Sequence, residues 1–252
     1  MATVKDIYDH IDKLAPFSMQ EGYDNSGLII GNMDCEVEKV LTALDITNEI
    51  VDEAVQKGAQ LIVTHHPLIF KPLKRIDTSS PAARLIAAGI NVISAHTSFD
   101  SALLNDILCG VIDLIPESPL HASNGVKCGY VCSCNEVSAS VIAKELKSTL
   151  GCGAVRYNDC GRQISRIAVC SGSGGDFLPD AIAHGCDAYI TGDVKHSVFI
   201  DAHNAGITVF DAGHFATENI FCEFVSAMLS ERFGDIRCSV ADSNRDILTY
   251  EV

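Results

Sequence analysis

Basic residues are scarce in this sequence. Lysine and arginine together number 18 against 33 aspartates and glutamates, which gives a formal net charge of -15 and a pI near 4.8. A surface of this sign repels polyanions, so we expect no binding to long nucleic acid. A small anionic substrate is still compatible with this charge, because bound divalent cations would invert the local field.

Long apolar runs are also missing. Charges at Lys5, Asp6, Asp9, Asp12 and Lys13 interrupt the N-terminal segment, which therefore lacks the apolar stretch of a secretory signal. Nowhere do about 18 apolar residues follow one another without a charge or a histidine, as a membrane-spanning helix requires. We expect a soluble, cytoplasmic protein that does not bind membranes.

Paired-cysteine motifs are absent, although the chain has eleven cysteines. The closest cluster, formed by Cys128, Cys132 and Cys134, has the spacing of neither a zinc ribbon nor a redox pair. An odd count without a secretory signal is typical of reduced thiols that pack as small hydrophobic groups. We therefore expect free thiols here and not a cysteine metal site.

The sequence contains an internal repeat. Over 252 residues, 47% are hydrophobic, which is enough to bury a substantial core. A shift of 127 residues, which places Gly185 on Gly58, aligns residues 40–66 without a gap on residues 167–193. Each copy has the pattern of a strand, a loop, a helix, a glycine and a second strand. Few identities support the match, so two unrelated β-α-β units are the alternative to a duplication.

The pattern of apolar residues supports the repeat. Beyond the first block the shift falls to 117, which places Gly206 on Gly89, because the first copy has a connecting loop ten residues longer. Apolar β-branched runs alternate with helical stretches, which predicts an α/β fold with helices covering the sheets. The expected strands are 40–44, 61–63, 91–94, 167–169, 188–190 and 208–210. The expected helices are 4–14, 50–57, 82–88, 139–150, 179–184, 198–205 and 219–233.

The break between the two halves is expected near Ser118 to Asn124, where Pro119 interrupts the pattern. This predicts two similar α/β lobes, residues 1–122 and residues 123–252.

Two adjacent histidines mark the end of one predicted strand. His65 and His66 follow the apolar run at 61–64, and ligands of open α/β sheets collect at the carboxyl ends of strands. Neighbouring residues on an extended chain point to opposite sides, so one strand could offer an imidazole to each of two ions. The alternative for such a pair is hydrogen bonding or packing.

Two further strand ends carry carboxylates and imidazoles. His96 and Asp100 follow one of them, although an aspartate at this position could instead cap the helix expected at 102–109. His214 and Glu218 follow another and lie four residues apart at the start of a helix, where both side chains share one face.

Together these residues form a ligand set of histidines and carboxylates without a thiolate. That mixture suits two divalent transition-metal ions, namely zinc, iron, manganese or nickel, better than a soft or an alkaline-earth ion. One carboxylate, for which we choose Glu218, could bridge ions about 3.5–4 Å apart.

Several motifs in one order resemble the dinuclear-metal Nif-three-like family, whose members are often described as type 2 GTP cyclohydrolase I. The resemblance covers nearly the whole chain. It runs through Tyr23-Asp24-Asn25-Ser26-Gly27-Leu28, Gly31, Leu44-Asp45, Thr64-His65-His66-Pro67-Leu68, Phe70-Lys71-Pro72-Leu73, His96-Thr97 with Asp100, Thr191-Gly192-Asp193-Val194-Lys195-His196 and Gly213-His214-Phe215-Ala216-Thr217-Glu218.

The resemblance implies a two-lobed fold with the ions in a cleft between the lobes, and a ring-shaped homo-hexamer. It also implies the metal ligands, which are His65, His66, Asp100, His214 and Glu218. The chain departs from the family pattern in three places: at Tyr23, where tryptophan is expected, at the short segment from Asp100 to Asn105, and at Ser197, where a second histidine is common.

Other polar residues are candidates for roles beside the metals. His96 could act as a general base or support a ligand, and the repeat places Lys195 and His196 where they could bind phosphate or stabilise developing negative charge. For Asp24 and Asn25 we favour a local turn. The glycine-rich stretch 171–175 could cradle an anion or simply reverse the chain.

These observations favour a metal-dependent hydrolase that acts on a small, nucleotide-like substrate. A metal-bridged hydroxide would attack an electrophilic carbon or phosphorus atom, and the resemblance implies opening of the guanine ring of GTP. The alternative is a non-catalytic metal-binding or metal-handling protein, such as a carrier, an insertase or a regulatory partner.

Overall fold

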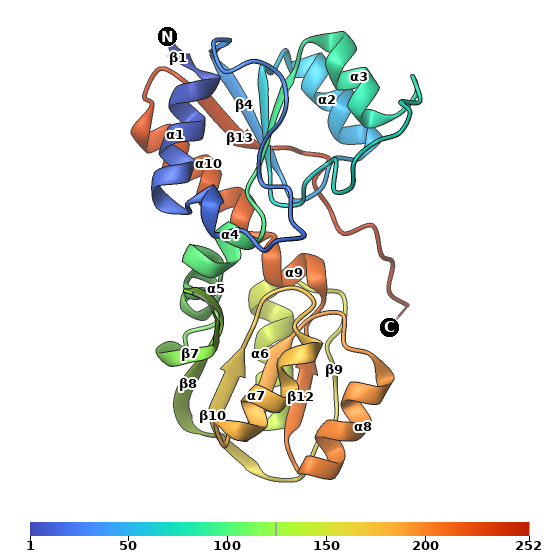
Figure 1. Cartoon of the computed structure of the whole chain (residues 1–252). Helices are drawn as coiled ribbons and strands as arrows, with labels where there is room; N and C mark the ends of the chain where they lie inside the picture. The colour runs from blue at the N-terminus through green and yellow to red at the C-terminus, as the bar shows by residue number, and fades with distance from the viewer. Residues whose placement is uncertain (124, 252) are drawn as a thin grey trace. The chain divides into compact units, whose positions relative to one another are not determined.

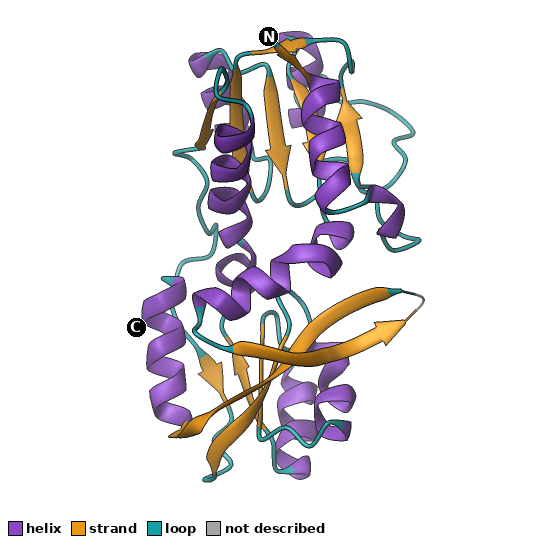
Figure 2. Ribbon diagram, turned by 90° about the vertical axis from the view of Figure 1, so that its left-hand side faces the viewer, coloured by secondary structure: helices purple, strands orange, loops and turns teal. Residues whose placement is uncertain are grey.

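The computed structural model describes residues 1–123 and 125–251, and the chain divides into two compact units. The first unit comprises Met1–Ala102 and Phe221–Arg245, and the second comprises Leu103–Ile220 and Asp246–Val252. Each unit is a sheet with helices packed on its faces (Figure 1, Figure 2). The predicted α/β class is confirmed.

The first unit is built on a five-stranded sheet. Its strands lie in the order β13 (Arg237–Val240), β4 (Lys39–Ala43), β5 (Leu61–Thr64), β6 (Asn91–Ser94) and β2 (Gly27–Ile30). The first four run parallel, and β2 pairs antiparallel with β6. β4 is buried except for its first residue and β5 and β6 are buried throughout, as expected for parallel strands covered on both faces. A separate two-stranded sheet pairs β1 (Ala2–Thr3) with β3 (Glu36–Val37).

Local signals in the sequence explain where its helices begin and end. α1 (Val4–Leu14) starts at a capping box in which Thr3 and Asp6 exchange hydrogen bonds. α2 (Asn48–Lys57) and α3 (Pro81–Ala88) each end at a glycine in the left-handed conformation. These two helices pack on one face of the sheet, where Ile50 and Leu85 meet Leu41 and Ile62. The remaining helical segments of the unit are η1 (Phe17–Met19), α4 (Thr97–Phe99) and α10 (Ile220–Arg232).

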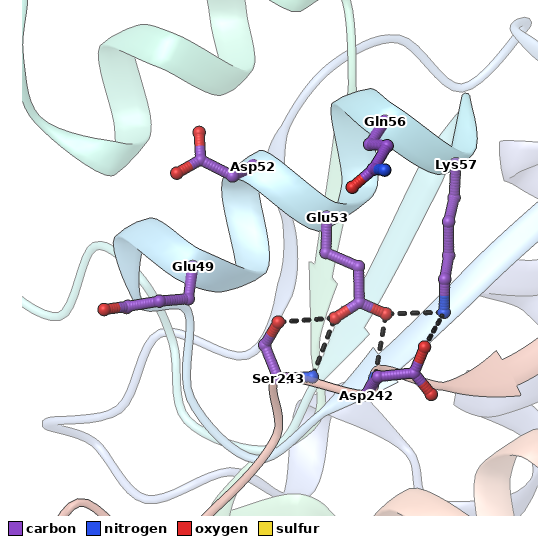
Figure 3. Close-up of a pocket in the computed structure, with 7 residues that line it drawn as sticks. All are labelled: Glu49, Asp52, Glu53, Gln56, Lys57, Asp242 and Ser243. Carbon is purple, nitrogen blue, oxygen red and sulfur yellow. Dashed lines mark hydrogen bonds and ion pairs between the residues drawn. The ribbon is translucent and has the colours of Figure 1, made fainter.

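The C-terminal segment returns to the first unit and is fastened there by Glu53 (Figure 3). The Glu53 carboxylate accepts hydrogen bonds from the amides of Asp242 and Ser243 at 2.8 Å and from the Ser243 hydroxyl at 2.7 Å. Lys57 Nζ lies 2.6 Å from the same carboxylate. Burial acts to raise the pKa of Glu53, but the bonds from Lys57, Ser243 and Asp242 outweigh it and lower the pKa to about 2.

This carboxylate should make the first unit acid-sensitive. Because the folded pKa of about 2 lies below the ordinary value of 4.5, ionised Glu53 stabilises the fold above pH 4.5, and the stabilisation is lost as the pH falls towards 2. We expect Glu53→Gln to lower the free energy of unfolding at neutral pH by on the order of 3 kcal/mol and to flatten its dependence on acidic pH. Urea unfolding at a series of pH values measures both effects. Glu223→Gln, on an exposed position of α10, is the control and should retain the wild-type profile.

The second unit has a six-stranded sheet. Its order is β7 (Ile115–Ser123), β8 (Val126–Ser138), β10 (Gln163–Val169), β11 (Ala188–Thr191), β12 (Thr208–Asp211) and β9 (Arg156–Tyr157). β10, β11 and β12 run parallel to one another. Residues of α5 and α6 pack on one face of this sheet and residues of α7 and α8 on the other. The helical segments of this unit are α5 (Asn105–Val111), α6 (Ala139–Leu150), η3 (Gly175–Phe177), α7 (Leu178–Ala183), α8 (His196–Ala205) and α9 (His214–Glu218). The segment η2 (Asp100–Leu104) begins in the first unit and ends in the second.

The strand registers of the two units follow the repeat alignment. Val40 pairs with Leu61 in the first unit, and the residues 127 positions later, Ile167 and Ala188, pair in the second. Leu61 pairs with Asn91, and Ala188 pairs with Thr208, which is the position that the shift of 117 requires. A duplication predicts this agreement, which the few sequence identities alone did not establish.

The division into units differs from the predicted halves at 1–122 and 123–252. The predicted break falls on β7, which pairs antiparallel with β8 in a long twisted ribbon (Figure 2); Asn124 lies outside the described residues. Proline in this segment indicated a linker, but β7 lies at the edge of its sheet, where proline is tolerated. Residues 221–245 belong to the first unit because β13 pairs with β4.

Cys128, Cys132 and Cys134 of β8 pack with the hydrophobic cores of the second unit, as expected for thiols that serve as small hydrophobic groups. Burial raises the pKa of the Cys186 thiol to about 11, which keeps it protonated. Among the described residues, no helix combines the length and the apolar character needed to cross a bilayer.

Candidate functional site

His65 is fixed at the carboxyl end of β5. Its side chain is fully buried, and its Nδ1 lies 2.9 Å from the carbonyl oxygen of Ala95. Since a carbonyl can only accept, Nδ1 carries the proton and the lone pair resides on Nε2. That Nε2 lies 3.4 Å from Oδ1 of Asp100. The Nε2 atom of His65, which could bind a metal ion, is therefore oriented by the backbone that follows the neighbouring strand β6.

His66 is oriented by a carboxylate. Its Nδ1 lies 2.7 Å from Oδ1 of Asp45, which follows the end of β4. Adjacent parallel strands bring their carboxyl ends to one sheet edge, so Asp45 and His66 meet there. Sequence reasoning included Asp45 in the family motif but gave it no role. An acidic residue directly after the strand next to a histidine-bearing strand is the signal that could have found it.

His96 is held by the buried carboxylate of Asp24. Asp24 Oδ1 lies 2.8 Å from His96 Nδ1, and Oδ2 accepts from the amide and hydroxyl of Thr97 and from the hydroxyl of Ser26. Burial acts to raise the pKa of Asp24, but the bonds from His96, Thr97 and Ser26 hold it well below the usual range. Asp24 therefore remains an ionised acceptor. The local-turn role expected for it is present in the bond to Ser26 but is only part of what this side chain does.

The three histidines of the first unit form one group. Each of His65, His66 and His96 offers a ring nitrogen, and these atoms all lie within 4.8 Å of one another. The ring of His65 lies 5.0 Å from that of His66 and 5.2 Å from that of His96, measured between centroids. Imidazole nitrogens at such separations can share a transition-metal ion.

Asp100 is not the N-cap of a helix. It has helical dihedral angles, φ -55° and ψ -48°, whereas an N-cap residue is extended. It begins a π-helical turn, η2, between α4 and α5. Turns of this kind are frequently found at functional sites. The capping alternative for Asp100 is therefore wrong, and its carboxylate is turned towards His65.

In the second unit, α9 brings His214 and Glu218 together as their spacing predicted. His214 Nε2 lies 2.8 Å from Oε2 of Glu218, and its Nδ1 lies 2.8 Å from Oδ2 of Asp193. Asp193 was not assigned this role from the sequence; it is a non-glycine residue with a positive φ of 52° shortly after β11. Such a strained conformation is a hint of function.

The glycine-rich stretch positions the Glu218 helix. The amide of Gly172 donates to the Thr217 hydroxyl at 3.0 Å, and the amide of Gly174 donates to that of Thr191 at 3.0 Å. Because the protein itself uses these amides, the structure favours the chain-reversal interpretation over an anion cradle. Gly172 has a φ of 61°, and a Cβ atom built on it would overlap the Glu218 carboxylate.

Lys195 and His196 lie at the start of α8, where Lys195 is the N-cap residue, and both are exposed. Among the described residues, His196 belongs to none of the groups of converging ligand atoms. The catalytic roles expected for Lys195 and His196 stay predictions.

The four histidines share one arrangement, in which Nδ1 faces an oxygen acceptor. Histidines that ligate metals almost always donate their second ring nitrogen to a carboxylate or carbonyl, which fixes the tautomer and the ring orientation. Fold and residues together define a class: a two-unit α/β protein with anchored imidazole and carboxylate groups that could hold a metal. The chain belongs to the Duf34/NIF3 (NGG1p interacting factor 3) family, whose sequence model matches residues 2–246.

Named relatives match over nearly the full chain. A GTP cyclohydrolase 1 type 2 homolog from Clostridium perfringens is 36% identical and covers 96% of this chain and 97% of its own length. A GTP cyclohydrolase 1 type 2 from Helicobacter pylori is 34% identical, with 91% and 92% covered.

Solved structures show the same fold. The Staphylococcus aureus hypothetical protein SA1388 superposes with a TM-score of 0.92 at 28% identity, covering 99% of both chains. Reduced HcgD from Methanocaldococcus jannaschii has a TM-score of 0.83 at 26% identity, covering 95% of this chain and 98% of its own. The family resemblance found in the sequence is thereby confirmed.

Proposed function

We propose that this protein is a metal-dependent hydrolase of a small, nucleotide-like substrate. In this proposal His65, His66 and Asp100 of the first unit and His214 and Glu218 of the second together hold two divalent transition-metal ions. The first three residues belong to one unit and the last two to the other, and the proposal joins the two sets. Its ligands are three neutral imidazoles and two carboxylates, which suits zinc, iron, manganese or nickel.

One observation carries the proposal: the Nδ1 atoms of His65, His66 and His214 each face an oxygen acceptor at 2.7 to 2.9 Å. His121 also has its Nδ1 beside a carboxylate, that of Asp180, but the ring nitrogens of His65 and His66 in addition lie within 4.8 Å of each other, as ligands of one metal centre would. Support by a carbonyl and two carboxylates also raises the basicity of the ligand nitrogen, which favours metal binding.

Two metal ions bound in this way would lower the pKa of a water ligand and polarise the substrate. The chain's own residues would supply the rest. His96, whose Nδ1 is held by Asp24, has Nε2 as its proton-accepting atom and is our choice for the general base. Lys195 and His196 are our choices for binding a phosphate or stabilising negative charge.

The substrate class follows from the relatives. Proteins named GTP cyclohydrolase 1 type 2 match this chain over most of its length, so GTP, whose guanine ring would be opened by hydrolysis, is the first substrate to test. The predicted ring-shaped hexamer and the cytoplasmic location stay predictions.

A nucleotide panel tests this proposal. Protein purified without a histidine tag, with its native metals, is assayed for turnover of GTP and other nucleotides. We expect hydrolysis that is lost in Glu218→Gln and retained in the control His203→Ala, which alters an exposed histidine of α8. Full metal occupancy without turnover of any nucleotide would instead indicate the alternative, a non-catalytic metal-handling protein.

A further inference from the structure

The loop that follows His66 has an unusual composition. Residues 67–80 connect β5 to α3, and the stretch 70–76 is exposed throughout. It contains three cations within five positions in a chain of net charge -15. Exposed apolar side chains alternate with them. The loop residues concerned are Phe70, Lys71, Leu73, Lys74, Arg75 and Ile76.

Phe70 forms part of an exposed aromatic pair beside the histidine group. The side chain of Tyr23 is 64% exposed and that of Phe70 is 42% exposed, and their ring centroids lie 6.2 Å apart. The Phe70 ring also lies 6.2 Å from the imidazole of His96, edge to face. Asn25 Nδ2 donates to the carbonyl oxygen of Ile69 at 2.6 Å, which fastens the loop to the segment that carries Tyr23.

The cations of this loop are available to an external anion. Within the described part of the chain, no salt bridge involves Lys71, Lys74 or Arg75. By contrast, Arg84, which follows the loop in α3, pairs with Asp52. Lys71 follows Phe70 directly in the sequence, and Lys74 and Arg75 come a few positions later on the same exposed stretch. Cations and aromatic rings on one loop complement a ligand that has both a planar ring and an anionic group.

We propose that Tyr23 and Phe70 stack the heteroaromatic base of a nucleotide and that Lys71, Lys74 and Arg75 bind its phosphates. The inference rests on the proposed function in one respect: the bound nucleotide would be hydrolysed with its base presented to His96. Binding itself does not depend on the metals. Base stacking on an aromatic side chain is tolerant of sequence and strong enough for removal of one ring to weaken binding by about tenfold.

Calorimetric titration of the full chain tests the proposal, using protein as purified and after treatment with a chelator. The probes are GTP, guanosine and inorganic tripolyphosphate. We expect Tyr23→Ser and Phe70→Ser each to weaken the binding of GTP and guanosine by about tenfold and to leave the binding of tripolyphosphate unchanged. The double variant Lys74→Gln, Arg75→Gln should bind GTP and tripolyphosphate about tenfold more weakly than the wild type and should bind guanosine equally well.

Two controls isolate the local effect. Tyr157→Ser removes an exposed tyrosine from the second unit, and Lys144→Gln with Lys147→Gln makes the same change in net charge on exposed positions of α6. Both should bind the three probes like the wild type. Equal losses in variants and controls, or wild-type protein that binds no GTP in either form, would overturn the inference.

If Tyr23→Ser or Phe70→Ser changed the oligomeric mass of the protein but not its GTP affinity, the inference would also be overturned. The aromatic pair would then be a contact between copies of the chain. The ratio of variant to wild-type GTP affinity is measured both with the native metals and after chelation. The test of this inference therefore still holds if the protein proves to bind no metal or to hydrolyse no nucleotide.

Discussion

Replacing His65 by alanine is expected to reduce the transition metal bound per chain by about 10- to 100-fold at limiting metal concentration. His65 is fully buried and its ring is fixed through Nδ1 by the Ala95 carbonyl, so alanine leaves no imidazole nitrogen at the position of its Nε2. The substitution removes one of the five proposed ligands, and with it a donor whose ring orientation is fixed by the fold. Hydrolysis of any nucleotide substrate should be lost in parallel.

Folding must be measured in the same experiment, because truncation of a buried ring leaves a cavity that costs stability. His65→Gln, which keeps much of the volume, should lose metal to a similar extent while the melting temperature stays closer to that of the wild type. His203→Ala should retain its metal. Normal metal content in a folded His65→Ala variant would remove this residue from the ligand set.

Gly172→Ala is expected to weaken metal binding although residue 172 is not a ligand. A Cβ atom at this position would overlap the Glu218 carboxylate, and the Gly172 amide holds the neighbouring Thr217 hydroxyl. The carboxylate must therefore move away from the position it has next to His214. We expect metal affinity, measured by competition with a chromophoric chelator, to fall by about 10- to 100-fold, as for loss of a residue that orients a ligand.

Gly185→Ala is the matched control. Gly185 has a φ of 68°, close to the 61° of Gly172, but a Cβ atom there would meet nothing within 4 Å. Both variants should lose about 1 kcal/mol of stability from the strained backbone. Only Gly172→Ala should lose metal affinity. Identical affinities in the two variants would show that Gly172 serves the backbone conformation alone and does not position Glu218.

Local sequence patterns determined much of the fold. The strands at 91–94 and the helices at 4–14 and 139–150 have the predicted bounds, because apolar periodicity and capping residues such as Thr3 act over a few positions. The repeat alignment also gave the register of the parallel strands, since one register error would move every side chain to the opposite face.

Long-range pairing was the part that the sequence did not reveal. β13 joins β4 from almost 200 residues away, and nothing near Arg237 indicates which sheet it completes. The β7 and β8 pair was missed because Pro119 suggested a break between the two halves.

The same distinction applies to the candidate site. His65, His66, His214 and Glu218 were recognisable by residue type at strand and helix ends, whereas Asp45 and Asp193 act only through contacts that the folded chain creates.

Elemental analysis of the wild-type protein, made without a histidine tag and dialysed free of loose metal, tests the central claim most directly. Two transition-metal ions per chain, lost together in His65→Ala and Glu218→Gln, is the result we predict. Wild-type protein that is folded but contains no stoichiometric metal, and takes up none from zinc, iron, manganese or nickel solutions, would contradict it.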